Sequence, residues 1–139
     1  MQIGFISGVF DLFHIGHLNL LKNAKGLCDK LIVGVFRDDS IVHKDKKAII
    51  PFKERIEIVR SVKFVDTAIP QEDEDKFALW QKLKFDTIFV GDDWFKSDRW
   101  EQAEKQLKEV GVKIIYFPYT KGTSSTLLSE ALIKLRDRV

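Results

Sequence analysis

The chain has 139 residues, of which 45% are apolar and 32% are charged, and its formal net charge is +2. This length predicts one domain, spanning residues 1–139, around a single core. The small net charge, with basic and acidic residues interleaved, argues against nucleic acid as a partner. No apolar run approaches the roughly 20 residues needed to cross a bilayer, so we expect no membrane partner.

The single cysteine, Cys28, cannot form an internal disulfide. The first residues lead into a strand pattern without a charged leader and an apolar segment of the signal-peptide type. We therefore expect a cytoplasmic protein. Cys28 falls at the end of an apolar helix face, which favours a buried, inert thiol over a reactive one.

Strand-like and helix-like patterns alternate along the whole chain. Short apolar runs predict five strands, at Gln2–Ser7, Leu31–Phe36, Asp66–Ile69, Thr87–Val90 and Lys113–Phe117. Helical spacing of apolar residues predicts helices near Gly16–Cys28, Pro51–Val62, Asp73–Leu83, Arg99–Val110 and Ser125–Arg136. This alternation predicts an α/β fold of three layers, with helices on both faces of a mainly parallel sheet. Ligands bind such folds beyond the carboxyl ends of the strands.

The stretch from Gly8 to His17 carries the strongest functional signal. It follows the first predicted strand and opens the first predicted helix, where backbone N–H groups and the helix dipole attract phosphate. His14 and His17 are three residues apart, so both imidazoles can project from one side of a first helical turn. Gly16 between them lets a ligand approach the backbone. By itself, this histidine spacing also fits a helix surface or a metal pair.

Other polar clusters also follow predicted strands, and the sheet would bring them to the same edge. Lys44 and Lys46 lie in the long connection after the second strand, where they can supply charge to a triphosphate or simply face solvent. Gly91 and Asp93 follow the fourth strand. There, a carboxylate can accept a hydrogen bond from a base or cap the next helix.

A glycine-containing stretch of small hydroxyl residues precedes the last predicted helix. It includes Thr120, Ser124 and Ser125. Hydroxyl groups and backbone amides at a helix start predict a second phosphate-binding site. Helix capping is the alternative for the two serines.

The segment from Gly8 to His17 reads GVFDLFHIGH, which resembles the HxGH signature of the cytidylyltransferase family. The stretch from Thr120 to Thr126 resembles the second signature of that family, with Tyr119 in place of an arginine. The resemblance covers nearly the whole chain and is strongest to the glycerol-3-phosphate cytidylyltransferases. It implies a Rossmann-like fold of the nucleotidylyltransferase superfamily, with a mainly parallel five-stranded sheet.

The resemblance also implies roles for individual residues. Catalytic roles fall on His14, His17, Lys44, Lys46 and Ser124. Nucleotide contacts fall on Gly8, Val9, Phe10, His14, His17, Lys46, Gly91, Asp93, Thr120, Ser124 and Ser125. Acceptor contacts fall on Asp11, Asp38, Arg55 and Lys63. Arg55 lies on a predicted helix, where it could equally well be a solvated arginine. Lys63 stands where the family has an arginine, and it keeps the positive charge without the bidentate geometry.

The activity implied by the resemblance is transfer of CMP from CTP to a phosphorylated small alcohol, such as glycerol 3-phosphate or a related phospho-compound. Pyrophosphate would be released and Mg²⁺ would be the cofactor, although the sequence shows no carboxylate cage for a metal. A homodimer is also implied. Two alternatives stay open: an adenylyltransferase of the same fold, and a nucleotide-binding module without turnover. The sequence leaves open whether Lys121 replaces the family arginine missing at Tyr119.

Overall fold

The computed structural model describes residues 1–38, 48–72, 75–91 and 98–117. Five parallel strands form one sheet in the order β3-β2-β1-β4-β5. They are β1 (Ile3–Gly8), β2 (Lys30–Phe36), β3 (Thr67–Gln71), β4 (Thr87–Gly91) and β5 (Lys113–Phe117). The helices of the described part are α1 (Ile15–Lys25), α2 (Phe52–Arg60), α3 (Lys76–Leu83) and α4 (Asp98–Glu109). The predicted Rossmann-like fold with a parallel five-stranded sheet is confirmed.

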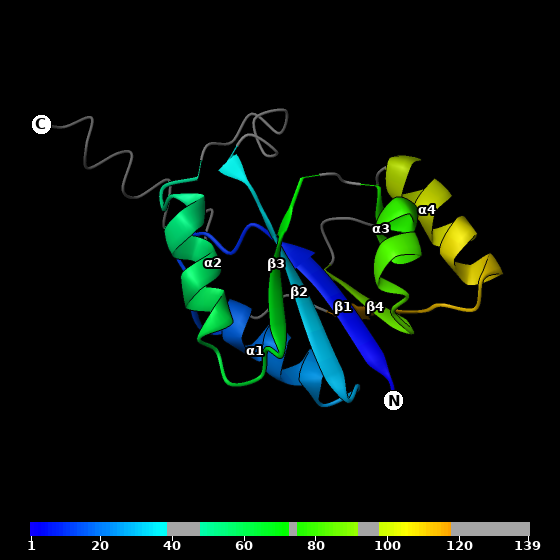
Figure 1. Cartoon of the computed structure of the whole chain (residues 1–139), viewed down its shortest axis with the longest axis horizontal. Coiled ribbons are helices and arrows are strands. Elements are labelled where there is room, and N and C mark those ends of the chain that lie inside the picture. The colour runs from blue at the N-terminus through cyan, green and yellow to red at the C-terminus, as the bar shows by residue number, and fades with distance from the viewer. Residues whose placement is uncertain (39–47, 73–74, 92–97, 118–139) are drawn as a thin grey trace, which may run out of the picture.

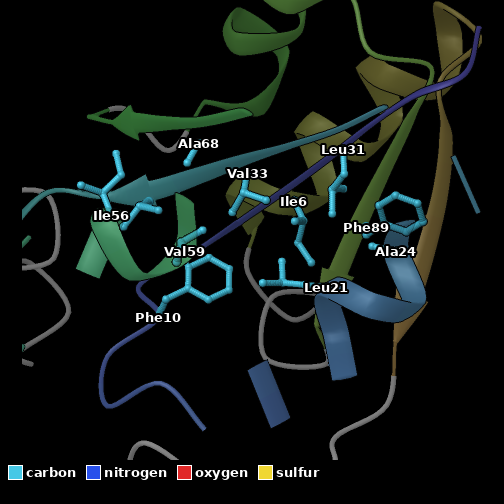
Figure 2. Close-up of a cluster of buried hydrophobic side chains, with 11 residues drawn as sticks. Ile6, Phe10, Leu21, Ala24, Leu31, Val33, Ile56, Val59, Ala68 and Phe89 are labelled. Carbon is cyan, nitrogen blue, oxygen red and sulfur yellow. The ribbon is translucent and has the colours of Figure 1, made fainter. Parts of the chain in front are cut away.

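Helices cover both faces of the sheet, with α1 and α2 on one face and α3 and α4 on the other (Figure 1). Each face has its own apolar core. Ile6 and Val33 belong to the core under α1 and α2, which Figure 2 shows. Phe5 and Leu107 belong to the core under α3 and α4. Neighbouring residues of one strand thus enter different cores, which explains why the central strands read as continuous apolar runs.

The first helix ends earlier than its apolar pattern predicts. It stops at Lys25, and Gly26 forms its C-cap. Leu27 continues the apolar spacing but is 54% exposed. The half-buried Cys28 donates a hydrogen bond from Sγ to the carbonyl oxygen of Ala24 at 3.3 Å. Burial raises the pKa of the Cys28 thiol, which favours an unreactive side chain.

The third helix begins at Lys76, where the carboxylate of Asp75 accepts hydrogen bonds from the first-turn amides at 3.0 and 3.2 Å. The predicted start of this helix at Asp73 lies outside the described residues, as does the whole predicted helix Ser125–Arg136. Within the ranges given above, no helix combines the length and the apolar character needed to span a membrane.

Aspartates hold the amino-terminal edge of the sheet. Each stands directly before a strand and accepts a hydrogen bond of 2.7 to 2.8 Å from a backbone N–H at the start of the neighbouring strand: Asp29, Asp66 and Asp86. These N–H groups lie at the strand starts, where the ladder offers them no carbonyl partner. Asp66 also pairs with Lys25, whose Nζ lies 2.7 Å from its Oδ2.

We predict that Asp66→Asn lowers the melting temperature by a few degrees at pH 7 and by less near pH 3. The hydrogen bond from Lys25 and then that from the Leu31 amide lower the pKa of Asp66. A lowered carboxyl pKa adds stability above the ordinary pKa, and this stability is lost as pH falls. Calorimetry at both pH values measures the effect. Glu57→Gln, which removes a 3.4 Å exposed pair with Arg60, is the control and should change little.

A melting-temperature difference between Asp66→Asn and the parent protein that stays the same at pH 3 would contradict this account of the pair.

Candidate active site

The turn between β1 and α1 lies at the carboxyl end of the central strand. β1 stands between β2 and β4, so strand order reverses at this point, which is where open parallel sheets bind ligands. α1 starts at Ile15 with His14 as its N-cap residue. The turn therefore combines a helix N-terminus with the switch point of the sheet, as the position of the motif predicts.

The two histidines cap the helix reciprocally. Nδ1 of His14 accepts a hydrogen bond from the amide of Gly16 at 3.0 Å, and Nδ1 of His17 accepts one from the amide of His14 at 3.2 Å. Their spacing of three residues is that of a capping box, in which the N-cap and N3 side chains each bind a backbone N–H. Because both Nδ1 atoms accept, each neutral ring must carry its proton on Nε2. Each imidazole can therefore donate from Nε2 to a phosphate oxygen.

Both rings are held in the neutral state. The ring of His17 packs against Phe10, Phe13 and His14, with centroids 5.4, 5.3 and 4.1 Å away. Desolvation by this burial, and then the charge of His14, lower the pKa of His17 to about 4. Desolvation also lowers the pKa of His14. At neutral pH the pair thus offers N–H donors, and a bound polyanion would draw protons onto it.

Arg55 is not a solvated arginine, because only 1% of its surface is exposed. Its Nε donates to the carbonyl oxygen of Ile50 at 2.8 Å, and its Nη1 donates to those of Val9 at 2.7 Å and Phe36 at 2.8 Å. Its Nη2 donates to Oδ1 of Asp38 at 2.6 Å. Asp38 also accepts from the first amide of α2 at 3.1 Å. The acceptor contacts implied for Arg55 and Asp38 stay predictions, and both side chains have protein partners.

Asp11 lies inside the turn and is 7% exposed. Its two carboxylate oxygens accept hydrogen bonds from the amides of Ile49 and Ile50, each at 2.9 Å. The residues on either side of it, Phe10 and Leu12, have φ angles of 55° and 49°. Bulky residues rarely adopt this left-handed conformation, so the surrounding contacts must hold the turn.

Lys76 is a buried cation that the sequence analysis did not single out. It is 4% exposed, and its Nζ donates to Oγ of Ser7 at 2.7 Å. Its Nζ also lies 5.0 Å from the ring centroid of Phe36, so the charge sits beside the carboxyl ends of β1 and β2. A lysine in the first turn opposes the helix dipole, and this mismatch was the available sequence signal.

Lys63 lies at the opposite edge of the sheet. It follows the end of α2 and precedes β3, so it stands near the amino ends of the strands, and it is exposed. Its Nζ lies 5.1 Å from the ring centroid of Phe64. The chain therefore does not bring its own Lys63 to the histidine turn, and the acceptor role that the resemblance implies for it stays a prediction.

A protein-family model described as cytidylyltransferase-like matches residues 5–131. The chain belongs to the cytidylyltransferase-like family. Membership makes it a nucleotidyltransferase enzyme and confirms the resemblance drawn from the HxGH stretch.

Two similar relatives carry different names. A glycerol-3-phosphate cytidylyltransferase of Bacillus spizizenii is 37% identical over 92% of this chain and 95% of its own length. An FAD synthase of Archaeoglobus fulgidus is 34% identical over 78% of this chain and 79% of its own. Among solved structures, a lipopolysaccharide core biosynthesis protein of Thermoplasma volcanium matches with a TM-score of 0.73 and 30% identity. That match covers 88% of this chain and 99% of the other.

Several residues expected in this cytidylyltransferase-like site have roles that stay predictions. Those outside the described residues are Lys44, Lys46, Asp93, Thr120, Ser124 and Ser125. Gly91 ends β4 and pairs in register with Phe117, at the same carboxyl edge as Gly8 and Val9. No group of three His, Cys, Asp or Glu side chains in the described ranges could hold a metal, so we assign no step to Mg²⁺.

We predict that both His14 and His17 carry their proton on Nε2 at pH 7, and that His17 stays neutral until about pH 4. Ring ¹⁵N chemical shifts across a pH titration measure both properties. Because an unfolded histidine binds its proton below an ordinary pKa of 6.5, the unfolded state takes up more protons between pH 6.5 and 4. The free energy of unfolding should therefore fall as pH decreases through that window.

The same titration in denaturant is the control, since every histidine should then titrate near its ordinary pKa. A His17 ring that becomes charged near pH 6.5 in the folded protein would contradict the burial argument.

Proposed function

We propose that this enzyme transfers CMP from CTP to a phosphorylated small alcohol, glycerol 3-phosphate or a related phospho-compound, and releases pyrophosphate. The observation that carries the proposal is the pair of neutral imidazoles with Nε2–H donors at the start of α1. The 37% identity to a glycerol-3-phosphate cytidylyltransferase over almost the full length of both chains supports the base and the acceptor class.

In the proposed reaction, a phosphate oxygen of the acceptor attacks the α-phosphorus of CTP. A new P–O bond forms as the bond to the β-phosphate oxygen breaks, and the electron pair of that bond leaves with pyrophosphate. Negative charge grows on the departing oxygens, where Nε2–H donors of His14 and His17 and the N-terminus of α1 stabilise it. The protein otherwise acts by holding the reactants in line, and no side chain becomes covalently attached.

The acceptor's phosphate has a candidate partner in Lys76. Its ammonium group is buried beside Ser7, at the carboxyl end of the strand that leads into the histidine turn. A buried cation at this edge favours an anionic group on the substrate. Mg²⁺ is proposed only as an ion that the triphosphate binds, and a homodimer is proposed as the assembly.

An adenylyltransferase is the second candidate. The 34% identity to an FAD synthase favours it, because FAD contains an adenosine group. The two candidates share the fold and the histidine turn, so they differ in the base and in the acceptor.

The decisive experiment measures pyrophosphate release from CTP and from ATP with a panel of acceptors that includes glycerol 3-phosphate, other phospho-alcohols and FMN. We expect turnover with CTP and a phospho-alcohol. His14→Ala and His17→Ala should each lower turnover by about a hundredfold, because preorganised charge stabilisation typically carries several kcal/mol of barrier. Asn23→Ala, on the exposed side of the same helix, is the control and should leave turnover unchanged.

Release only with ATP and FMN would favour the adenylyltransferase. No release with any pair would favour a binding module without turnover.

For base selection, we predict that Asp93→Ala reduces the ratio of kcat/KM for CTP to that for ATP by about tenfold. A carboxylate can accept a hydrogen bond from the cytosine amino group, and losing such a partner costs roughly 1–3 kcal/mol. Steady-state kinetics with both nucleotides test this. An unchanged ratio together with a lower melting temperature would show that Asp93 caps a helix instead.

A further inference from the structure

We propose that Asp11 and Arg55 are positioning residues, which fix the histidine turn by tying it to the backbone of residues 49 and 50. This inference rests on the proposed function, since it concerns the same site. It differs from the acceptor-binding role that the sequence suggested for both residues. Neither side chain needs to touch a substrate in this role.

The amide and the carbonyl oxygen of Ile50 are both held by hydrogen bonds to side chains. The amide of Ile50 donates to Asp11 at 2.9 Å, and the carbonyl oxygen of Ile50 accepts from Arg55 at 2.8 Å. Arg55 also donates to the carbonyl oxygen of Val9, at 2.7 Å, two residues before Asp11. These contacts close a ring of hydrogen bonds that runs from Val9 through Arg55 and Ile50 to Asp11 and back along the chain. A closed ring fixes the turn more tightly than any one bond, because each contact orients the next.

The turn needs such support because its backbone is strained. Three non-glycine residues of the described ranges have positive φ angles, and two of them are Phe10 and Leu12, on either side of Asp11. The third, Lys84, forms the C-cap of α3, where this conformation is common. Strained conformations persist only when surrounding contacts hold them, and Asp11 is the buried side chain placed between the two strained residues.

The strained turn sets the position of the histidines. The ring centroid of Phe10 lies 5.4 Å from that of His17. Phe10 belongs to the core under α1 and α2, where Figure 2 shows it beside Val59. The N-cap residue His14 follows Asp11 by three residues. A shift of residues 10 to 12 would therefore move both the backbone of His14 and the ring of Phe10 that packs against His17. Displacements of about 1 Å at a catalytic group can lower rates by up to a hundredfold.

The contacts of Arg55 also favour a positioning role over a substrate contact. Of the five N–H groups of a guanidinium, four have protein acceptors: three carbonyl oxygens and Asp38. The residue is 1% exposed. A phosphate would have to displace these partners to bind, and the carbonyl oxygens would then lose their hydrogen bonds.

The test is Asp11→Asn, which keeps the size of the side chain but places an NH2 group against a backbone N–H. We expect kcat to fall about tenfold to a hundredfold with the KM for the acceptor unchanged. We also expect the ring ¹⁵N shifts of His14 and His17 to change and the affinity for inorganic pyrophosphate, measured by calorimetry, to fall. Adding Leu12→Gly should recover part of each loss, because glycine adopts a positive φ without strain.

Asp86→Asn is the matched control. Asp86 also accepts a backbone hydrogen bond, from Ile3 at 2.8 Å, but it does so at the amino edge of the sheet. This variant should lower the melting temperature while kcat and the histidine ring shifts stay at their parent values. If Asp11→Asn alone does not fold, the comparison uses Asp11→Asn with Leu12→Gly against the parent and Leu12→Gly alone.

Two outcomes would overturn the proposal. One is a raised KM for the acceptor with unchanged kcat and unchanged ring shifts, which would mean that Asp11 contacts the acceptor. The other is a loss of kcat that Leu12→Gly does not relieve and that leaves the ring shifts unchanged. If the parent protein transfers no nucleotide at all, the proposed function fails. The ring shifts and the pyrophosphate affinity still decide whether Asp11 positions the turn.

Discussion

The buried guanidinium of Arg55 is the interaction on which the carboxyl edge of this sheet depends. A charge without solvent is costly unless its donors are satisfied, and here carbonyl oxygens from three separate segments satisfy them. Those segments are the turn after β1, the end of β2 and the residues before α2. Each carbonyl that lost its donor would cost roughly 1–3 kcal/mol, so the three segments are held in one arrangement. The turn that carries the histidines is thus built around a cation on another helix.

The histidine pair shows how one set of hydrogen bonds can serve both stability and chemistry. Each Nδ1 satisfies a backbone N–H that the start of α1 would otherwise leave unpaired. The same bonds fix the tautomer, so Nε2–H points away from the helix backbone as a donor. An Asp at the N-cap would also stabilise the helix, but its ionised carboxylate only accepts hydrogen bonds and would supply no such donor. The same two residues can therefore cap the helix and bind phosphate. The backbone N–H groups at the helix N-terminus need acceptors, and the oxygens of the substrate need donors.

Local sequence patterns predicted the fold and the histidine turn but not the contacts that hold the turn. The strands could be predicted because both faces of the sheet are buried, which makes each strand an apolar run. The long-range contacts could not be predicted, since Asp11 and Ile50 are 39 positions apart in the sequence and Lys76 and Ser7 are 69 positions apart. Contacts between such distant residues leave no periodic pattern of apolar residues in the local sequence. The end of α1 was placed too late because Leu27 continued the apolar spacing past Gly26.

The two edges of the sheet need opposite hydrogen-bond partners, and different residue types supply them at each edge. Parallel strands all begin at one edge with N–H groups that need acceptors, and aspartates directly before three strands supply them. The same strands end at the other edge with carbonyl oxygens that need donors, and there Arg55 supplies them, with Lys76 buried nearby. The donor to the carbonyl oxygens at the carboxyl edge is therefore a cation, Arg55, which also pairs with Asp38. The N-terminus of α1 lies at this same edge, where open parallel sheets bind ligands, so the location of the candidate site agrees with the direction of the strands.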